Sequence, residues 1–344
     1  MSHYSHRLED SMRRSVTMLA ATCAATAVVG AALVACGRDG DTEGAASDVS
    51  STTPAPTSLK GAESSGSSGT TTSTAVTAGT EPVGLIALGH SGLTGENSDP
   101  ANPRQPALEN SWATGTNPDV HSIYQRLVEV HPESEGHVAN TAAGGAASIT
   151  LSQQAQQAMV EVPTPELVII QTIDGDLNSC PLNEAELARF GENVTMALEQ
   201  IAAASPQSRI LMVTGFIRPD PAYDEQAVAA YPELEQEATG TPGECGTPFL
   251  APGEVNTAFF DMLTVRLEAF EAEQQRRCDA VPQCRTDDGA RAPFFFEVDH
   301  HAPMMNHLNV RGLAVQAELV WPVVVDVLGL DVSTDQTEPS TEPS

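Results

Sequence analysis

Basic residues are scarce in this sequence. It contains a single lysine, Lys60, and 16 Lys and Arg in total against 46 Asp and Glu, a formal charge of -30. A field of that sign repels a phosphate backbone, which excludes a nucleic-acid binder held by phosphate contacts. Aromatic residues make up only 4% of the chain, but a hydrophobic content of 40% still allows a core. The 344 residues suffice for one large domain or two ordinary ones.

The N-terminal segment has the features of an export signal. Arg13 and Arg14 precede a run of mostly small, apolar residues over positions 16–35, as in a secretory signal peptide. Leu33-Val34-Ala35-Cys36 resembles the bacterial lipoprotein box, which implies a signal peptide over residues 1–35 and a lipidated Cys36. An uncleaved membrane anchor is the alternative, although the alanine-rich run is marginal for a permanent span. We expect a lipid-anchored bacterial protein on the extracytoplasmic face of the cell membrane.

Two segments lack the apolar residues that a core requires. Residues 36–82 are dominated by Ser, Thr, Gly, Ala and Pro, and residues 331–344 end in two copies of Thr-Glu-Pro-Ser. Such segments bury too little surface to offset the entropy cost of ordering. We therefore predict a flexible tether, a domain over residues 83–330 and a disordered acidic tail.

Within that domain, predicted strands alternate with predicted helices. Buried-type apolar runs predict a parallel sheet whose two faces are covered by helices, that is, a three-layer α/β/α fold with five parallel strands. Helix caps are expected at Asn117 and at Asn183, and a long stretch over residues 216–253 has no clear pattern. The predicted strands are 84–88, 138–142, 167–170, 209–213 and 294–298, and the predicted helices are 117–130, 149–160, 183–204, 255–276 and 310–328.

Four cysteines remain once Cys23 leaves with the signal peptide and Cys36 is lipidated. In an exported chain, four cysteines predict two disulfides, for which three pairings exist. The short separation favours Cys278 with Cys284, which leaves Cys180 with Cys245. A zinc site is the alternative, but the spacings fit no common set of four ligands. We expect no metal and no cofactor.

Polar residues follow several of the predicted strands. Gly89-His90-Ser91-Gly92 ends the first strand, Gly144-Gly145 follows the second and Asp174-Gly175-Asp176 follows the third. Asp299-His300-His301 and His307 lie just before the last helix. Because chemistry gathers at the carboxyl ends of parallel strands, Ser91 and His307 form a candidate pair for acyl transfer. The acid and histidines before the last helix could instead bind a metal, whereas His90 is expected to hold the loop.

These blocks, in this order, resemble the SGNH hydrolases, also called GDSL esterases and lipases. The string Asn110-Ser111-Trp112-Ala113-Thr114-Gly115 adds to the likeness, which is strongest to a secreted bacterial branch. The resemblance implies a flavodoxin-like topology, with Ser91 as nucleophile and also as an oxyanion donor through its own N–H. It further implies Gly145 as a second oxyanion donor and His307 as the general base.

Two positions depart from the pattern of that family. Gly175 stands where the family has its oxyanion-hole Asn, and Met304 stands where it has the Asp of its triad. Loss of one oxyanion donor costs about 10²–10³ in rate, and disabling a triad Asp about 10⁴. A Ser–His dyad oriented by a backbone carbonyl, or recruitment of Asp299, could compensate, and Asn178 is a further polar neighbour.

Two functions are therefore open. The first is a lipid-anchored serine hydrolase of carboxylic esters, whose partners would be ester-bearing small molecules, lipids or acylated glycans. The second is a catalytically impaired lipoprotein that keeps the fold and binds a component of the cell envelope.

Overall fold

A computed structural model describes residues 82–177, 182–215, 220–230, 246–290, 297–302 and 307–330. Its centre is a five-stranded parallel sheet in the order β2-β1-β3-β4-β7, which is the flavodoxin-like order. This confirms the predicted fold class. The strands are β1 (Leu85–Gly89), β2 (Val138–Asn140), β3 (Leu167–Gln171), β4 (Arg209–Val213) and β7 (Cys284–Thr286).

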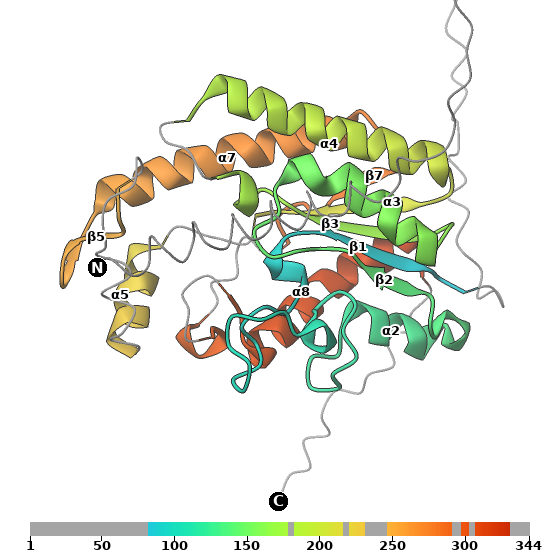
Figure 1. The fold of residues 1–344 in the computed structure, drawn as a ribbon, viewed down its shortest axis with the longest axis horizontal. Helices are drawn as coiled ribbons and strands as arrows, with labels where there is room; N and C mark the ends of the chain where they lie inside the picture. The colour runs from blue at the N-terminus through green and yellow to red at the C-terminus, as the bar shows by residue number, and fades with distance from the viewer. Residues whose placement is uncertain are drawn as a thin grey trace, which may run out of the picture. The chain divides into compact units, whose positions relative to one another are not determined.

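Helices cover both faces of the sheet, as Figure 1 shows. On one face, α3 (Leu151–Glu161), α4 (Glu184–Ala204) and α7 (Thr257–Asp279) pack with side chains such as Ile86 and Ile170. On the other face, α2 (Ile123–Val130) and α8 (Val310–Leu328) pack with the alternate side chains, such as Leu85 and Ile169. The central strands β1 and β3 are buried along their whole length because both of their faces are covered.

The fifth strand lies at a different place in the sequence from the predicted one. The structure forms it from Cys284–Thr286, which pairs with β4 and lies at the edge of the sheet that the described residues form. Of the predicted segment 294–298, Val298 begins the short 3₁₀ helix η6 (Val298–His300), Glu297 lies outside any strand and the other residues are outside the described ones. An edge strand needs no continuous apolar run, so Cys-Arg-Thr gave no signal.

Two further details differ from the sequence prediction. Helix α2 begins after Ser122 and not at Asn117, because Ser122 and Gln125 form a reciprocal capping box. The stretch 216–253, which was predicted to be irregular, contains the helix α5 (Pro221–Ala230) and the strand β5 (Phe249–Ala251), and β5 forms a hairpin with β6 (Glu254–Val255) directly after it. Asn183 caps α4 as predicted, by accepting a hydrogen bond from the N–H of Ala185.

One predicted disulfide falls on the described residues and is present. Cys278 at the end of α7 is bonded to Cys284 at the start of β7, which ties the edge strand to the helix before it. Cys180 and Cys245 lie outside the described residues, so their pairing stays a prediction. Across the described ranges, none of the helices is long and apolar enough to cross a bilayer.

Candidate active site

The turn after β1 presents Ser91 at the carboxyl edge of the sheet. A side chain at Gly89 would place its Cβ 1.7 Å from the carbonyl oxygen of Gln171, so only glycine lets the two backbones approach this closely. The amide of Gln154 fixes the turn by accepting from the N–H of Gly89 and donating to its carbonyl, at 2.8 and 2.9 Å. Ser91 then opens the 3₁₀ helix η1 (Ser91–Leu93).

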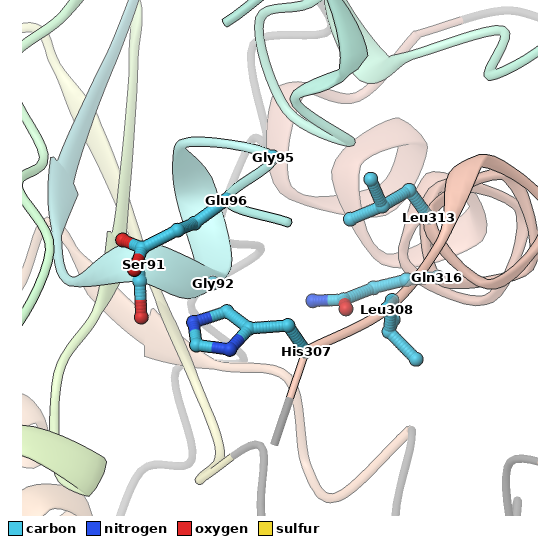
Figure 2. Close-up of a pocket in the computed structure, with 8 residues that line it drawn as sticks. All are labelled: Ser91, Gly92, Gly95, Glu96, His307, Leu308, Leu313 and Gln316. Carbon is cyan, nitrogen blue, oxygen red and sulfur yellow. The ribbon is translucent and has the colours of Figure 1, made fainter. Parts of the chain in front are cut away.

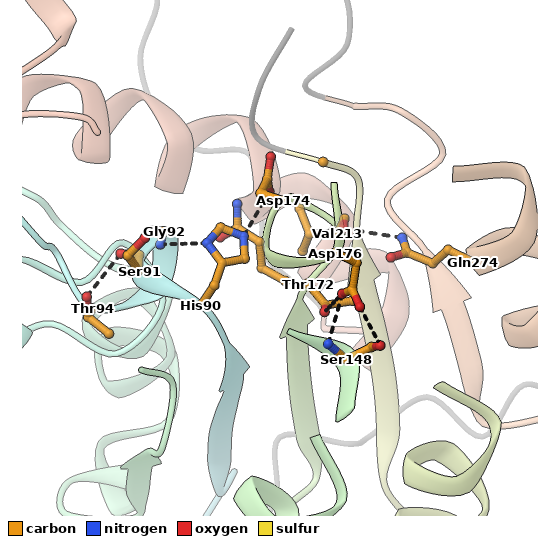
Figure 3. Close-up of polar contacts among 12 residues, drawn as sticks. His90, Ser91, Gly92, Thr94, Ser148, Thr172, Asp174, Asp176, Val213 and Gln274 are labelled. Carbon is orange, nitrogen blue, oxygen red and sulfur yellow. Dashed lines mark hydrogen bonds and ion pairs between the residues drawn. The ribbon is translucent and has the colours of Figure 1, made fainter. Parts of the chain in front are cut away.

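His90 holds this turn, as the sequence predicted. Its Nδ1 accepts a hydrogen bond from the N–H of Gly92 at 3.0 Å, and its Nε2 lies 2.8 Å from Oδ2 of Asp174. Figure 3 shows the imidazole between the loop after β1 and the loop after β3. Both ring nitrogens are thus engaged by the protein, and His90 acts as a positioning residue.

His307 reaches the same edge from the segment before α8. Its carbonyl accepts from the N–H of Ala302 at 3.0 Å, and His301 pairs with Leu308 in an antiparallel bridge, which fixes the backbone around the ring. The side chain is buried and lines a small pocket together with Ser91. In Figure 2 its Nε2 points toward the Ser91 hydroxyl.

The shared pocket is narrow. Its volume is about 10 Å³, close to the room that one water molecule requires. The structure thus brings together the two side chains that the sequence singled out for acyl transfer. The pocket is lined by Ser91, Gly92, Gly95, Glu96, His307, Leu308, Leu313 and Gln316.

Burial keeps the imidazole of His307 neutral. Loss of solvation is the main cause that lowers the pKa of His307 to about 4; the electrostatic effect of His90 lowers it further, and the carboxylate of Asp174 opposes the shift. At neutral pH the ring therefore carries no net charge. This is the protonation state that a general base requires.

Two residues of the site, Asn97 and Glu96, were not predicted from the sequence. Nδ2 of Asn97 lies 3.0 Å from Nδ1 of His307, at the ring position where a serine hydrolase triad has its carboxylate. Glu96 lines the pocket of Ser91 and His307, and burial raises the pKa of its carboxyl, an effect that His90 opposes. Both lie in the loop that follows Ser91, and a polar side chain in a loop gives no periodic signal.

The loop after β2 approaches this site through Glu96. A Cβ at Gly144 would lie 2.5 Å from the Glu96 carboxylate, so the backbone of Gly144 packs directly on it. Gly145, the predicted second oxyanion donor, is exposed, has a φ of +69° and has open space where a Cβ would stand. It belongs to the loop beside the pocket but is not among the residues that line it.

The loop after β3 has no room for an oxyanion-hole side chain at Gly175. A Cβ at Gly175 would lie 2.0 Å from the carbonyl oxygen of Ala146, so no side chain fits there. Next to it, the Asp176 carboxylate accepts from the N–H and hydroxyl of Ser148 at 2.8 and 2.7 Å (Figure 3). Burial raises the pKa of Asp176, against the effect of these hydrogen bonds. Asp176 therefore ties the loops after β2 and β3 together.

Asp299, which the sequence suggested as a compensating acid, has a different partner in the structure. The exposed carboxylate of Asp299 pairs with Arg311 instead. Met304 and Asn178 lie outside the described residues. Among the described residues, the group found at Nδ1 of His307 is the amide of Asn97.

One group of side chains could in principle bind a metal ion. Glu297, Asp299 and His300 offer ligand atoms within 4.8 Å of one another. However, Nδ1 of His300 accepts from the N–H of Glu297 at 3.1 Å, and Asp299 pairs with Arg311. These interactions stabilise η6 and its connection to α8, so the group already has a structural role.

Comparison with known proteins gives similarity at the level of solved structures. No family model and no curated protein matches the sequence. The solved structure of TesA is similar over 71% of this chain and 99% of its own, with 14% identity and a TM-score of 0.41. A GDSL-like lipase from Parabacteroides merdae is similar over 72% and 97%, with 11% identity and a TM-score of 0.42.

An extracellular lipase from Streptomyces rimosus is similar over 71% of this chain and 99% of its own, with 13% identity and a TM-score of 0.40. These structures are of the class that the sequence motifs resemble. At such identity and structural overlap they do not assign an activity. The assignment therefore has to come from the side chains at the carboxyl edge of the sheet.

Proposed function

We propose that this protein is a lipid-anchored, extracytoplasmic serine hydrolase that cleaves carboxylic esters, with Ser91 as nucleophile and His307 as general base. The observation that supports this most is the shared pocket of Ser91 and His307, in which a buried and neutral imidazole points at an alcohol. Positioning of a neutral base beside a serine hydroxyl is the requirement for nucleophilic acyl transfer.

The reaction follows from these two groups. The Ser91 oxygen attacks the ester carbonyl carbon, and its proton passes to Nε2 of His307 in the ring tautomer that has its lone pair on Nε2. The tetrahedral intermediate expels the alcohol, which takes that proton, and leaves an acyl-Ser91 ester. Water then attacks the acyl-enzyme with His307 again as base, and His307 returns that proton to the Ser91 oxygen as the carboxylic acid leaves. The backbone N–H groups of Ser91 and Gly145 are the proposed donors to the oxyanion.

The architecture of the site also predicts a slow enzyme. Gly175 leaves no room for a third oxyanion donor at its position, and the group at Nδ1 of His307 is an amide. Removal of one such donor alone costs about 10²–10³ in rate. This combination favours, as a second candidate function, an envelope-binding lipoprotein with impaired chemistry.

The proposed partners are an ester-bearing small molecule, a lipid or an acylated glycan.

Ester hydrolysis tests the proposal. The purified protein should hydrolyse p-nitrophenyl acetate, and Ser91→Ala should reduce turnover to the level of the buffer. Ser98→Ala is a matched control, since Ser98 lies in the same loop but its hydroxyl donates to the carbonyl of Gly95. Turnover that Ser91→Ala leaves unchanged contradicts the proposal, and a folded protein without turnover supports the binding function.

The anchor is tested separately. Cys36 is the proposed site of lipidation, after removal of residues 1–35, and residues 36–82 are the proposed tether to the domain at 83–330. Cys36→Ala should move the protein from the membrane fraction to the soluble fraction, and it should abolish incorporation of an alkyne-labelled fatty acid. A Cys36→Ala protein that stays fully membrane-bound contradicts the anchor.

A further inference from the structure

The amide of Asn97 has a defined orientation. Its Oδ1 accepts a hydrogen bond from the backbone N–H of Arg104 at 2.6 Å. A backbone N–H can only donate, so this contact identifies the oxygen end of the amide. The other end, Nδ2, is the group 3.0 Å from Nδ1 of His307. The two contacts together exclude the flipped amide.

The loop holds Asn97 in this position. Asn97 is buried, and its N–H donates to the carbonyl of Gln105 at 3.2 Å. Its φ of +67° lies in the left-handed region, which Asn and Asp tolerate better than other residues with side chains. Rotation of the amide would break the bond from Arg104 and leave a buried polar group without it. The amide is therefore a fixed donor to His307.

A fixed donor at Nδ1 determines the tautomer of the ring. Nδ1 must present its lone pair to Nδ2 of Asn97, so the single proton of the neutral imidazole lies on Nε2. Nε2 is the nitrogen that points toward Ser91 (Figure 2). A general base needs a lone pair there, and an amide in place of the triad carboxylate lowers kcat by about 10⁴ in a serine protease for this reason.

We infer that Asn97 is a positioning residue that holds His307 in the Nε2–H tautomer, and that a carboxylate at position 97 completes a Ser–His–Asp triad. The tautomer depends on the hydrogen bonds alone, whereas the gain in rate rests on the proposed function. A carboxylate has the shape of the amide that it replaces. One oxygen can still accept from the N–H of Arg104, and the other can accept a proton from Nδ1 of His307.

The surroundings of the ring allow this change. Of the described charged groups, Glu96 lines the same pocket, and His90 and Asp174 act on the ring electrostatically. Aspartate tolerates a left-handed backbone as asparagine does. The substitution Asn97→Asp therefore changes the hydrogen-bonding character at Nδ1 while it keeps the geometry of the loop.

Two measurements on the full-length protein test the inference. In ¹⁵N-histidine NMR at neutral pH, with the signal of His307 assigned by His307→Gln, the wild-type ring should carry its proton on Nε2. In Asn97→Asp the proton should move to Nδ1, and kcat/KM for p-nitrophenyl acetate should rise about 10²-fold or more. Ser91→Ala in the Asn97→Asp background should abolish that gain. Asn183→Asp, the same change at the distant N-cap of α4, should alter neither result.

The outcomes separate the inference from the proposed function. A wild-type ring with its proton on Nδ1 overturns the inference, and this result requires no variant to fold. A ring that keeps the Nε2–H tautomer in folded Asn97→Asp also overturns it. A tautomer that moves as expected, with no ester hydrolysis by either protein, supports the role of Asn97 and contradicts the proposed hydrolase.

Discussion

Oδ2 of Asp174 lies 2.8 Å from Nε2 of His90 at the carboxyl edge of the sheet, where the two side chains are only 10% and 5% exposed. The pair joins the loop that carries Ser91 to the loop after β3, while Nδ1 of His90 caps η1 through the N–H of Gly92. The histidine next to the proposed nucleophile thus stabilises the turn. The proposed general base is a different histidine, His307.

His90→Ala should reveal this structural role. It removes the cap of η1 and the partner of a buried carboxylate, and a buried group that loses its hydrogen bond costs about 1–3 kcal/mol. We expect the free energy of unfolding, measured by urea denaturation, to fall by that amount. His121→Ala is the matched control, because His121 pairs with Glu129 at the exposed surface and should change stability little. Equal effects of the two substitutions would contradict the role of His90.

The depressed pKa of His307 predicts a pH dependence of stability. Its pKa is about 4 in the folded state against an ordinary value of 6.5, so between these values the unfolded chain binds more protons. The contribution of His307 to the free energy of unfolding is therefore fully present above pH 6.5 and is lost as the pH falls toward 4. The shift corresponds to about 3 kcal/mol.

Other groups also titrate over this range, so the comparison that isolates His307 is with His307→Gln. The free energy of unfolding of the wild type minus that of His307→Gln should increase by about 3 kcal/mol from pH 4 to pH 6.5, because only the wild type gains stability from this group. A difference that is constant over this range would show that the His307 ring titrates normally.

Gly175→Asn does not restore an oxyanion hole in this structure. The new Cβ would lie 2.0 Å from the carbonyl oxygen of Ala146, so the loop after β2 has to move. Overpacking of this kind costs about 1–3 kcal/mol, and we expect lower stability and no gain in ester hydrolysis. Gly136→Asn is the control, since open space surrounds Gly136 and only its φ of +83° opposes a side chain. A faster Gly175→Asn enzyme would show that the loop can open for an asparagine.

The carboxylate of Glu96 should disfavour anionic substrates. Glu96 lines the pocket with Ser91 and His307, and two like charges about 4 Å apart repel by about 4 kcal/mol at an effective dielectric constant of 20. Glu96→Gln should raise kcat/KM for an ester with an anionic acyl group by about tenfold or more relative to a neutral acetate ester, the upper limit set by this repulsion being about 10³-fold. Glu109→Gln, at an exposed position in η2 (Leu108–Asn110), should leave this ratio unchanged. An unchanged ratio in Glu96→Gln would place the carboxylate away from the acyl group.

Much of the fold could be predicted from the sequence because its central elements are simple. The strands β1, β3 and β4 are apolar runs buried on both faces, and α8 has the predicted bounds because Asn309 caps its start and Gly329 ends it with a φ of +65°. The edge strand β7 and the helix α5 were missed. In both, the burial of the side chains depends on neighbouring elements and leaves no continuous or periodic apolar pattern.

The residues of the candidate site likewise divide into those that the sequence indicates and those that only the structure reveals. Ser91 and His307 could be singled out because each lies in a recognisable block at the end of an element. Glu96 and Asn97 could not, because their contacts with residues such as Gly144 and His307 join distant parts of the chain. The steric requirement for Gly175 likewise comes from the backbone of Ala146, which the sequence does not place.

Covalent labelling of the nucleophile tests the central claim most directly. A fluorophosphonate reacts with a serine that is activated by a base, and mass spectrometry of the digested protein locates the adduct. We predict an adduct on Ser91 that is absent in His307→Ala and retained in His121→Ala. A wild-type protein that carries no adduct on Ser91 at high reagent concentration, or an adduct that persists in His307→Ala, would contradict a nucleophile activated by His307.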